Sequence, residues 1–237
     1  MNHRPALLSV CLTVLLLPFA CANAGEVTAL VNAKIIPIGA DEIAEGILIL
    51  DGKKIVAVGT ADEITIPDEA KQIDAKGKTI MPGLICTHSH IGGIGGADGS
   101  GPIQPGVRVA ESINVRDSGF RRALAGGLTT LNIMPGSGHL ITGRTTYVKL
   151  RFADGPPSKI DDIFIRSEEG KPLGGLKMAN GTNSMRDKPF PGTRAKSAFL
   201  VREQYIKARE YRAKIERAGD NPDKMPPRDL HLSLIHI

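Results

Sequence analysis

Two histidines one residue apart stand at the end of an apolar run, in the stretch TIMPGLICTHSHIGGIGG from Thr79 to Gly96. On a β-strand, residues i and i+2 point to the same face, so His88 and His90 would present two imidazoles side by side, with Ser89 facing away. Two imidazoles fixed at a strand end can supply the first two ligands of a divalent metal ion. The glycine pairs that follow can turn the chain sharply and let other groups come close. We therefore predict a metal site at the end of this strand.

The histidine pair lies shortly after a change in the sequence pattern. Residues 25–81 contain several short β-type runs, and Asp51-Gly52 between two apolar runs predicts a hairpin. After Pro82-Gly83, strand, loop and helix patterns alternate, which predicts a parallel β/α arrangement. The strands expected in this second region are the runs LICTH, LTTLNI, TTYVKLRF, DIFIR and GGLKMANG.

Two helices are predicted in the second region. The run RDSGFRRALAGG has a helical pattern, with Asp117 or Ser118 as the N-cap and Gly126-Gly127 as the stop. Residues Thr193 to Arg217 have Ala, Tyr and Ile at helical spacing, and Gly219 ends this second helix. Its other face is basic with interspersed Glu, which we interpret as a solvated face with ion pairs rather than a site for an acidic partner.

The composition indicates a globular protein with an aliphatic core. The chain has 237 residues, enough for one large domain or for a small domain plus part of a larger one. Hydrophobic residues make up 41% of the chain, aromatic residues only 4%, and there is no Trp. The net charge of +5 is mild for this size, so we expect no nucleic-acid partner.

The first 24 residues have the pattern of a secretory signal peptide. Arg4 gives a short positive start, residues 6–22 are uncharged and mostly apolar, and an A-x-A site predicts cleavage before Gly25. A membrane anchor is the alternative, but the apolar run is short for a spanning helix. We therefore expect a periplasmic or secreted protein that has no membrane partner once the signal is removed.

The run MPGLICTHSH resembles the amidohydrolase superfamily, whose members carry a signature of the form PG-apolar-apolar-D-x-H-x-H. Cys86 stands where Asp is usual in that signature. The runs GLTTLNIMPGSGHLITGRTTYVKLR, GGLKMANGTN and PFPGTRAKSAFLVREQY resemble one branch, the exported imidazolonepropionase-like and peptidase-like amidohydrolases. The resemblance extends from about Val27 to Leu230.

This resemblance implies an α/β fold, a (β/α)8 TIM-type barrel preceded by a small β-sandwich. Residues 25–81 would form part of the sandwich, and residues 82–230 the first half of the barrel. A complete barrel takes about 250 residues, so we expect the barrel to be incomplete here and this chain to be inactive and poorly folded alone. In the family, a catalytic Asp ends the eighth strand and two further His ligands come from the fifth and sixth, none of which we find here. The end of the chain, residues 231–237, looks like a non-native tail.

The resemblance also assigns roles to particular residues. His88 and His90 would be metal ligands at the C-terminal face of the barrel. Relatives with two metal ions bridge them with a carboxylated lysine, and Lys177 in GLKMAN is the candidate, with an ordinary solvated lysine as the alternative. His139, in the loop PGSGHLITG, would contact substrate or serve as a structural hydrogen-bonding residue. Cys86 would be a ligand or nucleophile, or, as we favour, a small packed side chain.

The implied function is that of a metal-dependent amidohydrolase, which hydrolyses an amide or peptide C–N bond with metal-activated water. The expected cofactor is one or two divalent ions, zinc first, and the expected substrate a small molecule or small peptide. The full-length protein could form a homo-oligomer. The alternative is a non-catalytic secreted fragment that binds metal or another protein.

Overall fold

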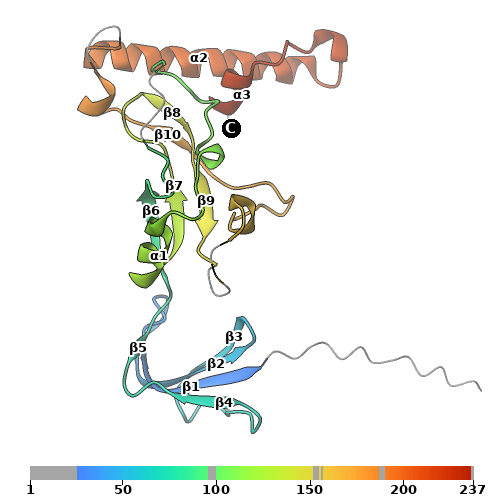
Figure 1. Cartoon of the computed structure of the whole chain (residues 1–237). Helices are drawn as coiled ribbons and strands as arrows, with labels where there is room; N and C mark the ends of the chain where they lie inside the picture. The colour runs from blue at the N-terminus through green and yellow to red at the C-terminus, as the bar shows by residue number, and fades with distance from the viewer. Residues whose placement is uncertain (1–25, 96–99, 152–154, 156, 187–189, 236–237) are drawn as a thin grey trace, which may run out of the picture. The chain divides into compact units, whose positions relative to one another are not determined.

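The computed structural model describes residues 26–95, 100–151, 155, 157–186 and 190–235 (Figure 1). The chain divides into two compact units, one up to Pro82 and one from Gly83 onward. The predicted signal peptide lies outside the described residues. None of the helices in the described part is long and apolar enough to cross a membrane.

The first unit is built on a five-stranded sheet in the order β3-β2-β1-β4, with β5 also paired to β1. β2 and β3 form an antiparallel hairpin whose pairing runs up to Asp51 and Lys54, so the hairpin predicted at Asp51-Gly52 is confirmed. β4 and β5 both run parallel to β1. The strands are β1 (Val27–Ile35), β2 (Ile43–Asp51), β3 (Lys54–Gly59), β4 (Lys71–Asp74) and β5 (Thr79–Ile80).

Both faces of this sheet carry apolar side chains. Ile47 and Ile49 pack with Ala29 on one face, whereas Leu48 between them packs with Ala33 on the other, as alternation along a strand requires. Between residues 26 and 82 the structure describes one sheet, so the β-sandwich stays a prediction.

The second unit begins with a strand–helix–strand unit. β6 (Leu84–Ser89) and β7 (Leu128–Ile133) are parallel, and α1 (Ser118–Ala125) lies between them in the chain. Asp117 is the N-cap of α1, because its Oδ1 accepts a hydrogen bond from the Gly119 N–H at 2.7 Å. The parallel β/α pattern is confirmed for these three elements.

The rest of the second unit departs from the predicted pattern. β9 (Thr146–Lys149) joins β6 and β7 as a third strand but runs antiparallel to β7. No helix is described between β7 and β9, and a parallel connection would need such a crossover, so a uniformly parallel arrangement is wrong here. The run DIFIR also forms no strand, because its pairing is limited to two isolated bridges, Phe164 with Val148 and Arg166 with Pro172. The complete barrel stays a prediction.

A second, two-stranded sheet pairs β8 (Ile141–Arg144) with β10 (Leu176–Met178) in antiparallel orientation. β8 was not expected from the sequence. Short 3-10 helices lie at Val109–Glu111, Ile160–Asp162, Thr182–Ser184 and Pro222–Lys224.

The main core of the second unit lies where α1 meets β7 and β9. Phe120 of α1 is completely buried and belongs to one cluster with Leu131 and Ile133 of β7 and Val148 of β9. Cys86 of β6 packs against the edge of this cluster. This core fixes β6 against β7, and therefore fixes the strand end that carries the histidine pair.

The long helix α2 (Arg194–Ala218) confirms the prediction for residues 193–217 (Figure 1). The Thr193 side chain caps it by accepting from the Lys196 N–H, and Gly219 with φ of 55° ends it. The ion pairs Lys207–Glu203 and Arg212–Glu216 are solvent-exposed, as expected of a solvated face. A short helix, α3 (Leu230–Ile235), follows and includes most of the segment interpreted as a non-native tail.

Candidate metal centre

His88 and His90 face each other at the C-terminal end of β6. Their Nε2 atoms are 3.0 Å apart, and the two rings meet edge to face at an interplanar angle of 86°. Both side chains are exposed, so their ring nitrogens can be reached from solvent. The structure therefore places the two imidazoles side by side, as the i, i+2 spacing predicts.

The neighbouring strand fixes the tautomer of His90. Its Nδ1 lies 2.8 Å from the carbonyl oxygen of Met134, the residue that follows β7. Because a carbonyl can only accept, Nδ1 carries the proton and Nε2 presents its lone pair toward His88. Metal-binding histidines are commonly held in this way by a hydrogen bond to the second ring nitrogen.

Cys86 supports the same strand end from within β6. Its Sγ lies 3.3 Å from the carbonyl oxygen of His88, to which the thiol donates, and its side chain is half-buried against the core. This packing agrees with our interpretation of Cys86 as a small packed residue.

Lys177 is brought to the histidine pair although it lies almost 90 residues further along the chain. Its side chain is buried, with 9% exposed, and its Nζ donates to the Met134 sulfur at 3.5 Å. The charge of Lys177 is the main cause that lowers the pKa of His88, followed by burial and by His90. Burial in turn lowers the pKa of Lys177. The hypothesis that Lys177 is an ordinary solvated lysine is therefore wrong.

His139 is not exposed to a substrate in this structure. Its side chain is completely buried, and its ring packs beside Phe190 with the ring centroids 5.1 Å apart. This position suits the structural alternative, and substrate contact by His139 stays a prediction.

The histidine pair fits a metal ion, but by itself it is an incomplete site. Tetrahedral zinc with Zn–N bonds of about 2.0–2.1 Å places two ligand nitrogens about 3.3–3.4 Å apart, so the observed Nε2 separation of 3.0 Å lies within a few tenths of an ångström of that spacing. Within the described residues, no group of three or more His, Cys, Asp or Glu side chains comes together. The two imidazoles and Lys177 are thus the groups of the described chain that could hold a metal here.

Met134 is the residue of this centre that sequence reasoning missed. Its carbonyl orients His90 and its sulfur contacts Lys177. The sequence does indicate this position, because Met134 directly follows the apolar strand LTTLNI. The ends of neighbouring parallel strands meet at one edge of a sheet, so the residue after this strand is expected to lie beside the histidine pair.

Comparisons with known proteins indicate the class of protein that this chain resembles. No family profile matches the chain. A dihydroorotase of Caldicellulosiruptor saccharolyticus is 30% identical over 54% of this chain and 27% of its own length. A dihydroorotase of Syntrophus aciditrophicus is 27% identical over 72% of this chain and 36% of its own length, and an amidohydrolase of Hapsidospora irregularis is 26% identical over 70% of this chain and 19% of its own.

A solved structure indicates the same class of protein as these relatives. The amidohydrolase of Thermotoga maritima superposes with a TM-score of 0.72 at 30% identity, covering 88% of this chain and 54% of its own. This chain therefore has the mixed α/β fold of part of an amidohydrolase and is similar in sequence and in structure to members of the amidohydrolase superfamily. It spans between a fifth and two fifths of the three curated relatives and about half of the solved structure.

Proposed function

We propose that the protein is a metal-dependent hydrolase that cleaves the C–N bond of a small cyclic amide or a small peptide. The observation that carries the proposal is the convergence of His88, His90 and Lys177 at one strand end, with the two Nε2 atoms 3.0 Å apart. Relatives named dihydroorotase and amidohydrolase support this reaction class.

The residues of this chain prepare the site in two ways. Met134 holds His90 in the tautomer whose Nε2 is free to bind a cation. The lowered pKa of His88 favours its neutral form, which a ligand needs. His88 and His90 would hold a divalent ion, zinc first, and the bound ion would activate water and polarise the scissile carbonyl.

Lys177 would complete the site after reacting with carbon dioxide. A neutral amine adds to CO2 and releases one proton, which leaves a carbamate with two oxygen atoms. Burial lowers the pKa of Lys177 and so raises the neutral, reactive fraction of its amine. The carbamate oxygens would then provide ligands for one ion or bridge two.

We further propose export to the periplasm or the outside of the cell, on the basis of the N-terminal charge, apolar run and A-x-A site. A non-catalytic metal-binding protein is the second candidate, because the described residues supply only two imidazoles to the centre. The two functions differ in whether bound metal is accompanied by hydrolysis.

The test is hydrolysis of dihydroorotate and of a panel of dipeptides by the zinc-loaded full-length protein that contains this chain. We expect His88→Ala and His90→Ala each to reduce the rate by about a hundredfold or more, since each removes a metal ligand. Lys177→Met, which removes the amine but keeps a long unbranched side chain, should also remove activity and abolish any stimulation by bicarbonate. His231→Ala changes an exposed histidine of α3 and should leave the rate unchanged. Metal binding with no hydrolysis of any substrate would favour the non-catalytic alternative.

A further inference from the structure

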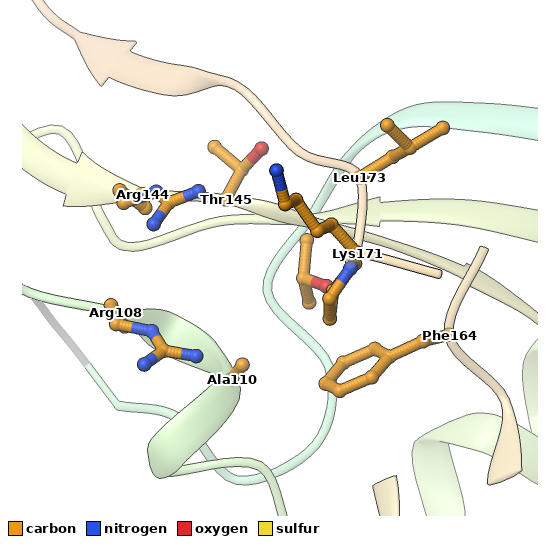
Figure 2. A pocket seen from close by; sticks show the side chains of 9 residues that line it. Arg108, Ala110, Arg144, Thr145, Phe164, Lys171 and Leu173 are labelled. Atoms are coloured by element: carbon orange, nitrogen blue, oxygen red, sulfur yellow. The ribbon is translucent and has the colours of Figure 1, made fainter. Parts of the chain in front are cut away.

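A pocket of about 230 Å³ lies in the second unit, lined by three cationic side chains (Figure 2). Arg108, Arg144 and Lys171 surround it, and the ring of Phe164 forms part of its wall. The remaining lining residues are Ala110, Thr145, Thr146, Pro172 and Leu173. The pocket therefore combines concentrated positive charge with a small apolar surface.

The positive charge is only partly neutralised. Arg108 pairs with Glu111 at 3.2 Å and Lys171 with Glu169 at 2.6 Å, but all four side chains are at least half exposed. Such exposed pairs contribute little, so a ligand can compete for the two cations. Within the described part of the chain, no hydrogen bond or ion pair engages the guanidinium of the half-buried Arg144.

The backbone holds the two arginines next to each other. Arg108 and Arg144 form an isolated parallel bridge, and the Arg144 N–H donates to the Val107 carbonyl at 2.7 Å. Two like charges on paired residues repel each other, and a bound anion would relieve that repulsion. The buried hydroxyl of Thr146 also lacks a hydrogen-bond partner among the described residues.

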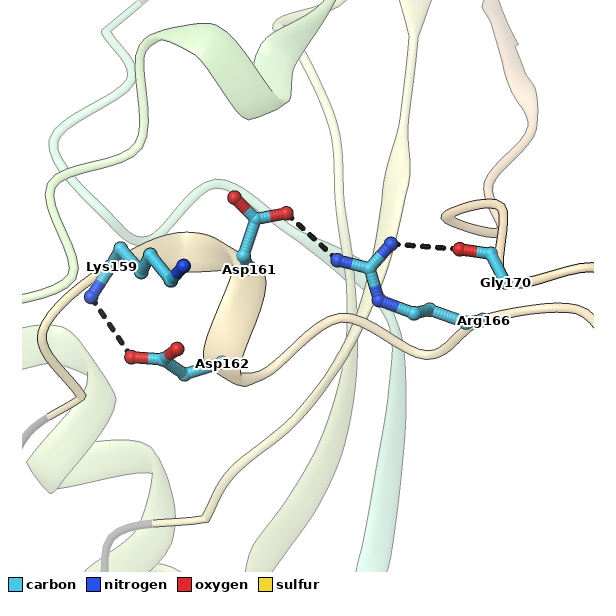
Figure 3. A network of polar contacts seen from close by, with 5 residues as sticks. All are labelled: Lys159, Asp161, Asp162, Arg166 and Gly170. Atoms are coloured by element: carbon cyan, nitrogen blue, oxygen red, sulfur yellow. Dashed lines mark hydrogen bonds and ion pairs between the residues drawn. The ribbon is translucent and has the colours of Figure 1, made fainter.

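The opposite wall of the pocket is also fixed. Arg166 donates to the Asp161 carboxylate at 2.7 Å and to the Gly170 carbonyl at 2.8 Å, and Figure 3 shows both bonds. These two bonds tie together the segment that carries Phe164 and Lys171, and the Arg166 guanidinium lies 5.4 Å from the Phe164 ring centroid. The pocket is thus formed by side chains whose supporting segments are held in place before any ligand binds.

We propose that this pocket binds a small organic carboxylate, with the carboxylate between Arg144 and Arg108 and a compact apolar group against Phe164. Arginine is the side chain best suited to grip a carboxylate with two parallel hydrogen bonds. The volume lies below the range of about 300–1,000 Å³ typical of drug-sized ligands, which favours a ligand of few heavy atoms.

The site does not depend on the proposed metal centre. Arg144 pairs with Leu176 across the β8–β10 sheet, whereas Lys177 pairs with Gly143. Successive residues of a strand project to opposite faces, so the Arg144 and Lys177 side chains leave this sheet in opposite directions. Binding to the pocket should therefore survive the loss of His88 and His90.

The test is calorimetric titration of the full protein with benzoate, and with benzamide as an uncharged molecule of the same shape. We expect benzoate to bind with a Kd on the order of 1 mM and benzamide about tenfold more weakly or not at all. Inorganic phosphate, which lacks the apolar group, should bind more weakly than benzoate. Arg144→Gln should weaken benzoate binding by about tenfold, whereas Arg209→Gln, which removes an exposed charge from α2, should not change it.

Two results would overturn the proposal. One is equal binding of benzoate and benzamide, and the other is unchanged benzoate binding by Arg144→Gln protein that is folded by circular dichroism. If Arg144→Gln does not fold, Arg108→Gln decides instead, because that exposed side chain can be replaced without disturbing the core. Retention of full benzoate affinity by Arg108→Gln would then reject the site.

Discussion

Gly143 is a position at which a single methyl group should damage both sites. It lies on β8, where it pairs with Lys177 and directly precedes the pocket residue Arg144, and its φ is +126°. A Cβ at this position would approach the Val107 carbonyl oxygen to 2.5 Å and the Val107 Cβ to 2.9 Å. We predict that Gly143→Ala strongly destabilises the second unit.

The expected magnitude has two parts. A side chain held at this φ costs on the order of 1–3 kcal/mol, because only glycine adopts the conformation without strain. Overpacking against a neighbour costs about 1–3 kcal/mol, and the upper end applies here because backbone atoms cannot rotate away as a side chain does. The sum is about 4–6 kcal/mol, a large fraction of the 5–15 kcal/mol that typically stabilises a domain.

The assay is urea unfolding, with Gly170→Ala as the matched control. Gly170 also has a positive φ, of +77°, but a Cβ there would meet no atom within 4 Å. Gly170→Ala should therefore cost only about 1 kcal/mol, from backbone strain without a clash. Equal unfolding midpoints for the two variants would show that β8 does not approach Val107 as described.

Three further predictions follow from other parts of the chain. Phe120→Ala should lower the free energy of unfolding by about 3–5 kcal/mol, because the ring is completely buried; Phe199→Ala, at 46% exposure, is the control and should cost far less. Hydrogen bonds from the Ser158 hydroxyl, and next from the Lys159 N–H, hold the pKa of Asp162 below its ordinary value. The ionised Asp162 carboxylate therefore stabilises the fold above its unfolded pKa of about 3.9, and this stabilisation disappears as the pH falls through the lower folded pKa. Urea unfolding from pH 7 to acid should therefore show a gap between parent and Asp162→Ala that closes only under acid conditions, and a pH-independent gap would contradict this. N-terminal sequencing of exported protein should begin at Gly25, whereas a mature chain that retains Met1 would reject the signal peptide.

Features governed by neighbouring residues could be predicted from the sequence. The Asp51-Gly52 hairpin, the Asp117 and Thr193 caps, and the adjacency of His88 and His90 each depend on a few consecutive residues. Their conformations follow from local steric preferences and hydrogen bonds, which the sequence pattern reports directly.

Features that depend on distant residues could not be predicted in the same way. The direction of β9 depends on how the chain returns after β7, and β8 becomes a strand only because β10 pairs with it. The burial of Lys177 follows from that same pairing. The cationic pocket joins Arg108, Arg144 and Lys171 from three separate segments, which no local pattern connects.

The most direct test of the account is the metal content of the protein. We would purify the full-length parent protein, its His88→Ala/His90→Ala double variant and its His231→Ala control, load each with zinc, remove free metal and measure bound metal by elemental analysis. The account predicts one or two bound ions in the parent and in the control, and near-complete loss in the double variant, because a zinc site that lacks two of its usual four ligands binds weakly. Equal metal content in the double variant and the parent would contradict it.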